Sequence, residues 1–382
     1  MAFRHTPPLS CRTSPLQGGR SDVAVAFANL DSCRKGGMAE TANLPPCGGD
    51  GRQAREGCLG STFDIGSSSM TDYKTLIDAE TWAFIEKTNS YYPPDTIDYT
   101  VPQQRAIYDR MCREFFAGYR QGVTAETTVI AMPTNSIPIR IYRNAAPDKA
   151  AMVLYAHGGG FILGGLDSHD DVCAELCART GYEVVSVDYR LAPEHLHPAA
   201  FDDVMDAFEW AARTYDCPVL LCGDSAGGNL CAAVAHATRG HKKKPIGQVL
   251  IYPSLGGDHS RGSYVTHAEA PMLTARDVEF YKHIRTGGMN QTGDITLSPL
   301  ADADFAYLPP TVLITAECDP LSSDGEAYRD RVVAAGGRAW WFEEPGLVHG
   351  YLRARHMVGR ARASFTRIVE AVSVLGKSEW IW

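Results

Sequence analysis

The pattern of apolar and polar positions changes near residue 70. Residues 1–69 contain many Gly, Pro, Ser and Arg residues and no sustained apolar period, which is typical of a segment without a packed domain. Within residues 70–125, Thr81–Glu86 and Gln103–Tyr119 carry apolar residues at helical spacing. The sequence therefore predicts a disordered or non-native extension followed by helices, and Met70 is a candidate start codon.

Strand patterns begin after residue 125. Thr127–Ile130 and Ile137–Tyr142 alternate apolar and polar residues and predict an antiparallel hairpin. Six strand-sized apolar runs then alternate with helical stretches, at Met152–Ala156, Glu183–Val187, Val219–Cys222, Gln248–Tyr252, Val312–Ala316 and Ala339–Phe342. This rhythm predicts an α/β fold with a mostly parallel sheet covered by helices on both faces. In such sheets, sites form at the carboxyl ends of the strands.

One connection between these strands is too long for a simple crossover. The segment between Tyr252 and Thr311 contains a predicted helix at Ala275–Ile284. We expect an insertion at about 254–305 to fold with the helices of residues 70–125 as a cap. The remainder, residues 126–382, is then the sheet-containing domain.

Composition narrows the function classes. The chain has 382 residues, 45% hydrophobic and 21% charged, with a net charge of -9, so no global positive field would attract nucleic acid. None of its apolar runs approaches the roughly 18 to 20 residues that span a bilayer, and we expect no membrane insertion. Val23–Leu30 is a poor signal-peptide core, so we expect a cytoplasmic protein.

The cysteines give no sign of a metal or a disulfide framework. Eleven are scattered along the chain, without a CxxC pair or a zinc-type Cys/His spacing. Cys173 and Cys177 lie four residues apart on a predicted helix, and we interpret them as small buried hydrophobes. The sequence predicts no metal site.

A candidate nucleophile lies in the run Gly223–Gly227. Ser225 is its central residue, directly after a predicted strand and before a predicted helix at Gly228–Arg239. The run alone is a weak motif, but a strained strand-to-helix turn with small neighbours lets a serine hydroxyl project from the sheet. The helix also directs its positive dipole end toward that hydroxyl.

A stronger motif follows the strand Met152–Ala156. His157, Gly158, Gly159 and Gly160 form a tetrad in which backbone N–H groups can approach an oxyanion without Cβ atoms in the way. We predict the N–H groups of Gly158, Gly159 and Ala226 as donors. His157 could serve as a base, but its position favours a role in anchoring the loop by hydrogen bonding.

The nucleophile requires a base and an acid, which in this fold follow it in the order Ser, acid, His. Asp319 lies just past the strand Val312–Ala316 and is the predicted acid. Glu317 and Asp324 are rivals, although we expect Asp324 to cap the next helix. His349 follows the last strand, on a loop that we expect to open at Pro345 and Gly346, and is the predicted base.

The remaining histidines after Ser225 suit the role of base less well. His356 lies near the start of the C-terminal helix, and we expect it to be exposed. The others precede the acid, and we expect them to be surface or cap residues: His236, His241, His259, His267 and His283.

These motifs together resemble the bacterial hormone-sensitive lipase family. The resemblance rests on His157–Gly160, the stretch Asp188–His195, Gly223–Gly228 and Asp319–Leu321, and the Gly-Asp-Ser-Ala-Gly form resembles one branch of the family. It implies an α/β-hydrolase fold with a helical cap, carboxylesterase activity on short acyl chains, and the triad and oxyanion residues named above. It also implies that no metal or organic cofactor is required and that a homodimer is common.

Two alternatives remain from the sequence. Within the same mechanism, the substrate of this chain could be an amide, a lactone or a longer-chain lipid ester instead of a small ester. Outside it, the chain could be a ligand-binding protein on this fold, since receptors similar to the family have lost the catalytic histidine. The presence of His349 favours the enzyme.

Overall fold

The computed structural model describes residues 71–133 and 135–382, so the predictions for residues 1–69 and for Met70 lie outside it. The helices are α1 (Tyr73–Leu76), α2 (Ala79–Tyr91), α3 (Val101–Phe115), α4 (Asp170–Thr180), α5 (Ala199–Thr214), α6 (Ala226–Ala237), α7 (Ser263–Thr266), α8 (Ala275–Thr286), α9 (Ser322–Ala334) and α10 (Gly359–Gly376). Three short 3-10 helices are η1 (Thr96–Asp98), η2 (Pro299–Ala301) and η3 (Tyr351–His356).

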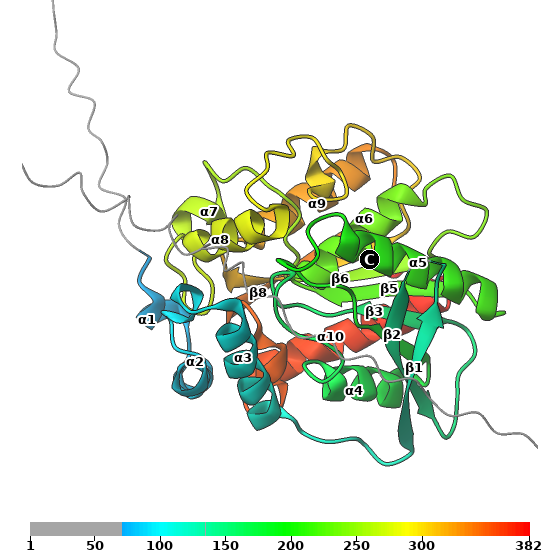
Figure 1. The fold of residues 1–382 in the computed structure, drawn as a ribbon, viewed down its shortest axis with the longest axis horizontal. Coiled ribbons are helices and arrows are strands. Elements are labelled where there is room, and N and C mark those ends of the chain that lie inside the picture. Colours follow the sequence, from blue (N-terminus) through cyan, green and yellow to red (C-terminus); the bar gives the residue numbers. More distant parts are fainter. Residues whose placement is uncertain (1–70, 134) are drawn as a thin grey trace, which may run out of the picture. The chain divides into compact units, whose positions relative to one another are not determined.

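The strands form one sheet (Figure 1). They are β1 (Val123–Ala131), β2 (Ser136–Asn144), β3 (Met152–Ala156), β4 (Glu183–Val187), β5 (Val219–Asp224), β6 (Gly247–Ile251), β7 (Thr311–Cys318) and β8 (Ala339–Val348). Their order is β1-β2-β4-β3-β5-β6-β7-β8, with β1 and β2 antiparallel to their neighbours and the rest parallel. The predicted hairpin and mostly parallel sheet are therefore confirmed.

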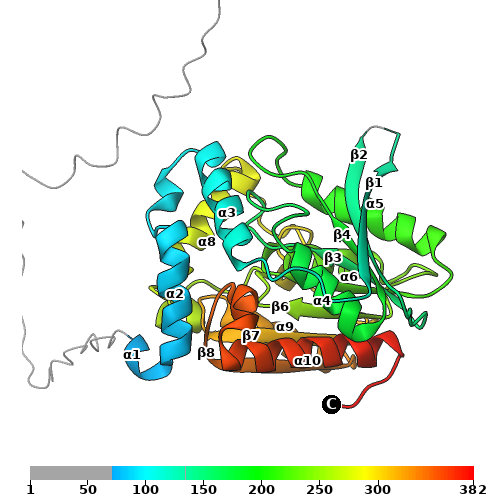
Figure 2. The ribbon, with the colours of Figure 1, turned by 90° about the horizontal axis from the view of Figure 1, so that it is seen from below.

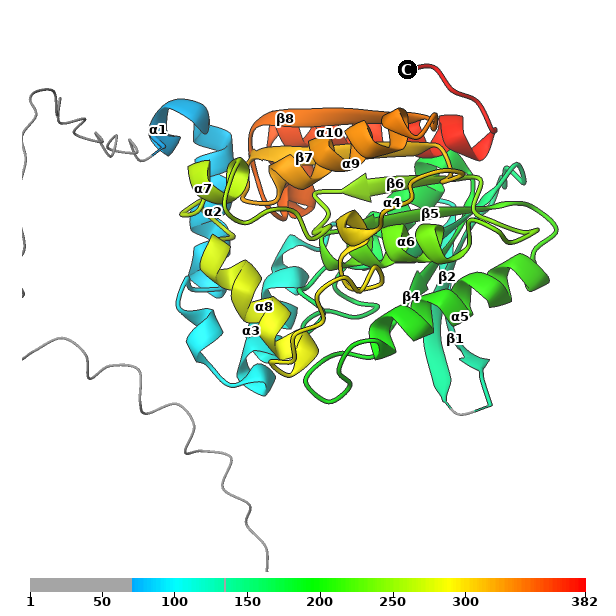
Figure 3. The same cartoon turned by 90° about the horizontal axis from the view of Figure 1, so that it is seen from above.

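Helices cover both faces of the sheet. Helices α4 and α10 pack on one face, as Figure 2 shows, and α5, α6 and α9 pack on the other, as Figure 3 shows. Strands β3, β5 and β6 are buried at every residue, because helices exclude water from both sides. This explains their continuous apolar runs.

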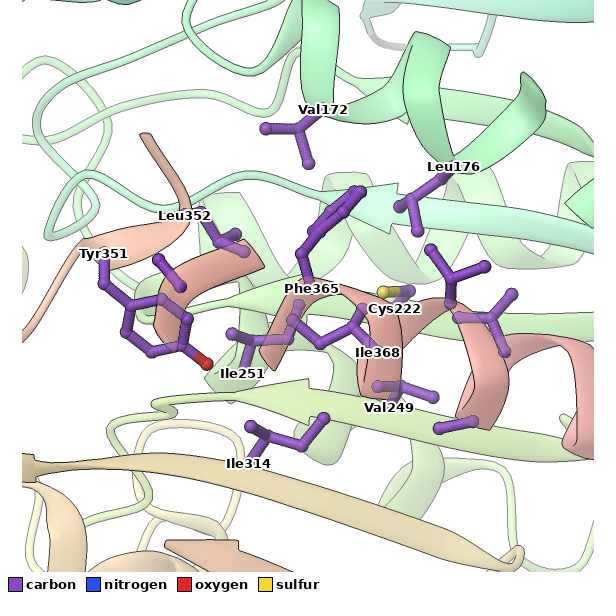
Figure 4. Close-up of a cluster of buried hydrophobic side chains, with 14 of the residues drawn as sticks. Val172, Leu176, Cys222, Val249, Ile251, Ile314, Tyr351, Leu352, Phe365 and Ile368 are labelled. Atoms are coloured by element: carbon purple, nitrogen blue, oxygen red, sulfur yellow. The ribbon is translucent and has the colours of Figure 1, made fainter. Parts of the chain in front are cut away.

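The α10 face illustrates the packing of the core (Figure 4). Phe365 and Ile368 of α10 lie over Val249 and Ile251 of β6, and all four side chains are at most 1% exposed. Truncating a side chain of this size in such a core typically costs about 3 to 5 kcal/mol. This packing holds the central strands in register.

Strand β8 is longer than the sequence predicts. Pro345 and Gly346 do not open a loop, because the strand continues past them to Val348. Beyond a register shift, Val348 pairs with Cys318 of β7. The residues that follow this pair, Asp319 and His349, therefore leave the sheet side by side.

Helices α1–α3, α7 and α8, which we call the cap, gather at one end of the sheet (Figure 1). The hydroxyl of Tyr92, the residue that directly follows α2, lies 3.3 Å from the hydroxyl of Tyr281 in α8. Arg276 of α8 forms a 3.2 Å ion pair with Asp98. The two chain segments thus pack together despite their separation in sequence.

Candidate active site

Five chain segments leave the sheet at the same edge. The register pairs Ala156 with Gly223 and Asp224 with Ile251, so the residues after β3, β5 and β6 emerge next to one another. The pair Cys318 and Val348 brings the ends of β7 and β8 to the same edge. Carboxyl ends of parallel strands form the site in this type of fold.

The turn between β5 and α6 holds Ser225 in a strained conformation. Its φ of 53° and ψ of -116° place a non-glycine residue outside the ordinary allowed regions. The chain passes so close to β3 here that a Cβ on Gly227 would lie 1.9 Å from the Ala156 carbonyl oxygen. Glycine at 227 is therefore required by close approach, as the sequence motif predicts, although α6 begins at Ala226, not at Gly228.

The structure brings the three predicted triad residues together. His349 Nε2 lies 2.9 Å from Ser225 Oγ, and His349 Nδ1 lies 2.7 Å from Asp319 Oδ2. Asp319 is fully buried, and its Oδ1 accepts a 2.9 Å bond from the Leu321 N–H. With Nδ1 protonated toward the carboxylate, Nε2 is free to accept the serine proton.

Asp224, the residue before Ser225, binds the loop His157–Gly160, which we call the glycine loop. It is 3% exposed and accepts hydrogen bonds from Tyr155 Oη at 2.8 Å and from the Gly158 N–H at 2.9 Å. Its other oxygen lies 3.2 Å from His169 Nε2. Burial would raise the pKa of Asp224, but the charge of His169 and these hydrogen bonds hold it below its usual value.

The hydrogen bond between the Gly158 N–H and Asp224 rules out Gly158 as an oxyanion donor, contrary to the prediction from sequence. The Gly158 N–H is buried and already bonded to Asp224, so it has no capacity for a substrate oxygen. Gly159 and Gly160 are partly exposed and line the cavity above Ser225, as does Ala226. Their N–H groups donate to no backbone or side-chain acceptor in the described part of the chain, so the candidate donors are Gly159, Gly160 and Ala226.

Gly159 has a specific steric role. Its φ is 127°, and a Cβ there would lie 2.2 Å from the Leu163 carbonyl oxygen. The Gly159 carbonyl in turn accepts the N–H groups of Ile162 and Leu163 at 3.1 and 2.9 Å. The loop therefore folds back on itself only with glycine at this position.

His157 lies behind the loop, away from Ser225. Its Nδ1 is 2.7 Å from the Gly158 carbonyl, and its ring stacks on Tyr189 at 4.3 Å between centroids. Tyr189 Oη donates to the His157 carbonyl at 2.7 Å. Burial lowers the pKa of His157 to about 4, helped by His169. These contacts support a role in holding the loop rather than one as base.

The rival acids have other partners. Glu317 accepts the Gly346 N–H at 2.7 Å. Asp324 does not cap α9, since the N-cap is Leu321; it is buried and accepts from the Leu255 N–H at 2.7 Å and from Tyr264 Oη at 3.2 Å. Asp324 failed as a predicted cap because it lies within the first turn of α9, where its side chain faces the insertion.

Among the other histidines, His236 corrects a second expectation. It is 2% exposed, and it bridges Asp302 at 2.7 Å and Tyr328 Oη at 3.0 Å. A histidine in a buried hydrogen-bond network cannot be recognised from sequence spacing alone. His356 is exposed and pairs with Glu175 at 3.0 Å.

A cavity of about 480 Å³ opens over Ser225 and His349. Its aromatic and apolar walls come from the cap and from the residues that follow the glycine loop, at Tyr92, Tyr108, Met111, Phe161, Leu163, Met272, Leu273 and Tyr281. Cavities of 300 to 1,000 Å³ with such walls and a few polar groups are typical of small-molecule sites.

Sequence reasoning missed several residues of this site. His169 and Tyr155, which bind Asp224, carry no local motif, and neither do the cavity arginines Arg285 and Arg353. Within residues 71–133 and 135–382, no cluster of three or more His, Cys, Asp or Glu residues could hold a metal ion. Over the same ranges, every helix is too short or too polar to cross a membrane.

Comparison with known proteins agrees with the geometry. The sequence profile of the alpha/beta hydrolase fold family matches residues 153–353. Carboxylesterase NlhH of Mycobacterium tuberculosis is 37% identical over 265 residues, which cover 64% of this chain and 83% of that protein. Esterase LipI of the same organism is 35% identical, with 67% of this chain and 85% of the relative covered.

A solved structure shows the same architecture. An ester hydrolase from the metagenome of Lake Arreo superposes with a TM-score of 0.72 at 29% identity, covering 79% of this chain and 98% of that one. The matched residues contain the glycine loop, the serine turn, Asp319 and His349. This chain therefore belongs to the alpha/beta hydrolase fold family, among the carboxylic ester hydrolases similar to hormone-sensitive lipase.

Proposed function

We propose that the chain hydrolyses small carboxylic esters by way of a covalent acyl-enzyme, with Ser225 as nucleophile. The observation that carries the proposal is the continuous hydrogen-bonded chain from Ser225 through His349 to Asp319, with distances of 2.9 and 2.7 Å. A serine hydroxyl near neutral pH needs such a base, and the base needs an orienting carboxylate.

These contacts support the following proposed steps. His349 Nε2 takes the Ser225 proton as Oγ attacks the ester carbonyl carbon, and the imidazolium is stabilised by Asp319. The resulting oxyanion accepts hydrogen bonds from the N–H groups of Gly159 and Gly160 in the glycine loop and from that of Ala226, which lies at the N-terminus of α6. Collapse expels the alcohol with the proton held by His349. Water, deprotonated by the same imidazole, then releases the acid and restores Ser225.

The cavity supports a preference for short acyl chains. A volume of about 480 Å³ must hold both the acyl and the alcohol group, and a long fatty chain would have to leave it. We assign residues 71–125 and 254–305 to a cap that closes this cavity over the domain 126–382, because Tyr281 and Met111 of those segments line it.

The test is turnover of 4-nitrophenyl esters from acetate to palmitate. We expect the highest kcat/KM between acetate and hexanoate, and a loss of kcat of about 10⁴-fold or more in Ser225→Ala. Ser373→Ala, on α10 outside the cavity, is the matched control with wild-type turnover. Unchanged turnover in Ser225→Ala would overturn the assignment, and a maximum at palmitate would overturn the chain-length preference.

Two further assignments rest on other grounds. A homodimer is proposed from the family resemblance alone, and light scattering after gel filtration should give twice the mass of one chain. A cytoplasmic location is proposed because the short apolar run Val23–Leu30 lies between charged residues and contains Asn29, which makes it a poor signal-peptide core, and cell fractionation tests it. A monomer, or enzyme in the exported fraction, would contradict the respective assignment.

A further inference from the structure

Two arginines line the catalytic cavity without a carboxylate partner. Arg285 of α8 and Arg353 of η3 both contribute to its wall. Neither has an Asp or Glu oxygen within 4.0 Å in the part of the chain that the structure describes. In a chain with a net charge of -9, two arginines of one cavity without a carboxylate at that distance are unexpected.

The contacts of Arg285 leave its charge largely uncompensated. It is 4% exposed, and its guanidinium stacks on the Phe161 ring at 3.6 Å. Within the described ranges, its guanidinium also donates two long hydrogen bonds of 3.3 Å to the carbonyls of Leu297 and Thr296, and Nε has no acceptor there. Burial of an unpaired charge is costly, and burial lowers the pKa of Arg285 to about 9.

Arg355, a second buried arginine, has the carboxylate partners that Arg285 lacks in the described part of the chain. It is 2% exposed and lies two residues after Arg353, but outside the cavity. It binds Asp171 at 2.7 Å and Glu175 at 2.9 Å. A buried arginine outside the cavity thus has two carboxylates, whereas Arg285, buried to a similar degree, has none among residues 71–133 and 135–382.

Arg353 is placed beside the catalytic histidine. Its Nη1 lies 3.4 Å from the position of a Cβ on Gly350, the residue after His349. The guanidinium stacks over the Tyr108 ring at 4.9 Å and donates to the Tyr108 hydroxyl. Arg353 is partly exposed and lines the cavity, and its buried Nε has no acceptor among the residues that the structure describes.

The acidic residues of the cavity wall already have partners. Asp224 is bonded to His169, Tyr155 and Gly158, as described above. Glu279 pairs with His259 at 2.6 Å, and Asp258 pairs with Arg261 at 3.0 Å. The cavity wall thus carries three carboxylates, Asp224, Asp258 and Glu279, and three basic side chains, Lys282, Arg285 and Arg353. In the part of the chain that the structure describes, none of these carboxylates lies within 4.0 Å of either arginine.

From this arrangement we propose that the natural ester carries a carboxylate, and that Arg353 and Arg285 bind it. The inference rests on the proposed esterase function and specifies its substrate class. Guanidinium groups bind carboxylates through charge-assisted, often bidentate hydrogen bonds. The carboxylate can belong to the acyl group, as in a half-ester of a dicarboxylic acid, or to the leaving alcohol.

Two substrate pairs separate these sources. For the acyl side, mono(4-nitrophenyl) glutarate is compared with 4-nitrophenyl pentanoate. For the leaving group, 4-acetoxybenzoate is compared with its methyl ester. In each pair kcat/KM is measured after subtraction of spontaneous hydrolysis. We expect the anionic member to be preferred by about 10- to 100-fold in at least one pair.

Charge-removing variants test the two arginines. Arg353→Met and Arg285→Met should each lower the ratio of anionic to neutral kcat/KM by about tenfold or more, and Arg353→Lys should restore part of it. Arg276→Met, which removes an exposed arginine of the same helix α8, is the control with an unchanged ratio. Thermal unfolding establishes that each variant is folded.

The outcomes are distinct. No hydrolysis of the neutral esters would be a failure of the esterase function itself. Hydrolysis of neutral esters with no preference for either anionic partner would overturn the carboxylate proposal alone. An equal loss on both members of a pair in both Met variants would also overturn it, because it would make the arginines purely structural.

Discussion

The catalytic edge of the sheet and the cap are held by different kinds of contact. At the sheet edge, Ser225 and Asp319 follow strands buried on both faces, and Asp224 binds four groups inside the protein. In the cap, the ion pair Arg276–Asp98 has side chains 74% and 60% exposed. The comparison teaches that the carboxylate beside Ser225 is buried and bonded by several groups, whereas the ion pair between two segments of the cap is open to solvent.

The largest expected effect is at the sheet edge. His349→Ala should lower kcat for 4-nitrophenyl acetate by about 10⁴- to 10⁶-fold, because base and nucleophile act as a unit. The thermal unfolding temperature should change little, since His349 faces the cavity. His356→Ala, an exposed histidine seven residues on, is the control. A kcat of His349→Ala within tenfold of wild type would contradict the assignment.

The next effect tests the glycine loop. Gly159→Ala should lower kcat by about 100- to 1,000-fold, because its Cβ would collide with the Leu163 carbonyl and displace the oxyanion donors. Gly293→Ala has a similar positive φ, 86°, but open space around it, and it measures backbone strain alone. Equal turnover in the two variants would remove the loop from the mechanism.

A third prediction compares how much one aspartate from each region contributes to the free energy of unfolding. Asp224→Asn should lower the free energy of unfolding by about 3 kcal/mol, because it breaks a buried, multiply bonded carboxylate. Asp98→Asn in the cap should cost at most about 1 kcal/mol, since exposed pairs contribute little. Urea denaturation of both variants measures the difference. Similar losses would show that the two regions are held alike.

The last prediction concerns the pH dependence of stability at Asp324, which joins α9 to the insertion. Burial raises its pKa to about 7 in the folded state, with Asp319 adding to the shift and Leu255, Gly257 and Tyr264 opposing it. An ordinary aspartate in the unfolded chain has a pKa of about 3.9. The folded state therefore holds the proton more tightly, and its stabilisation is complete below about pH 4 and is lost as pH rises to about 7.

Asp324→Asn removes this titration. Relative to the variant, the wild-type free energy of unfolding should fall between pH 4.5 and 7.5, by at most about 1.4 kcal/mol per pH unit. Chemical denaturation of both proteins across that range gives the difference. Parallel curves, or a wild type that gains stability with pH, would contradict the buried protonated carboxyl.

The sequence predicts the features that local residue patterns mark, but not the contacts that form only when distant segments fold together. The strands and the serine turn follow from local signals, because apolar runs mark buried strands and small residues mark the turn. Asp319 and His349 are predicted instead from their order in the chain after Ser225. The Gly158 error arose because sequence shows which N–H groups could bind an oxyanion but not which ones another side chain already holds. Arg285 and Arg353 carried no signal, since their meaning depends on partners that only the folded cap and η3 reveal.

The central claim is that Ser225 is the nucleophile, and a serine-directed organophosphate tests it most directly. Peptide mass mapping after inactivation should find one adduct per chain, on the peptide that contains Ser225. The loss of 4-nitrophenyl acetate hydrolysis should match the labelled fraction, and Ser225→Ala should remain unlabelled. An adduct on another residue that tracks the loss of activity, or full activity with Ser225 fully labelled, would contradict the account.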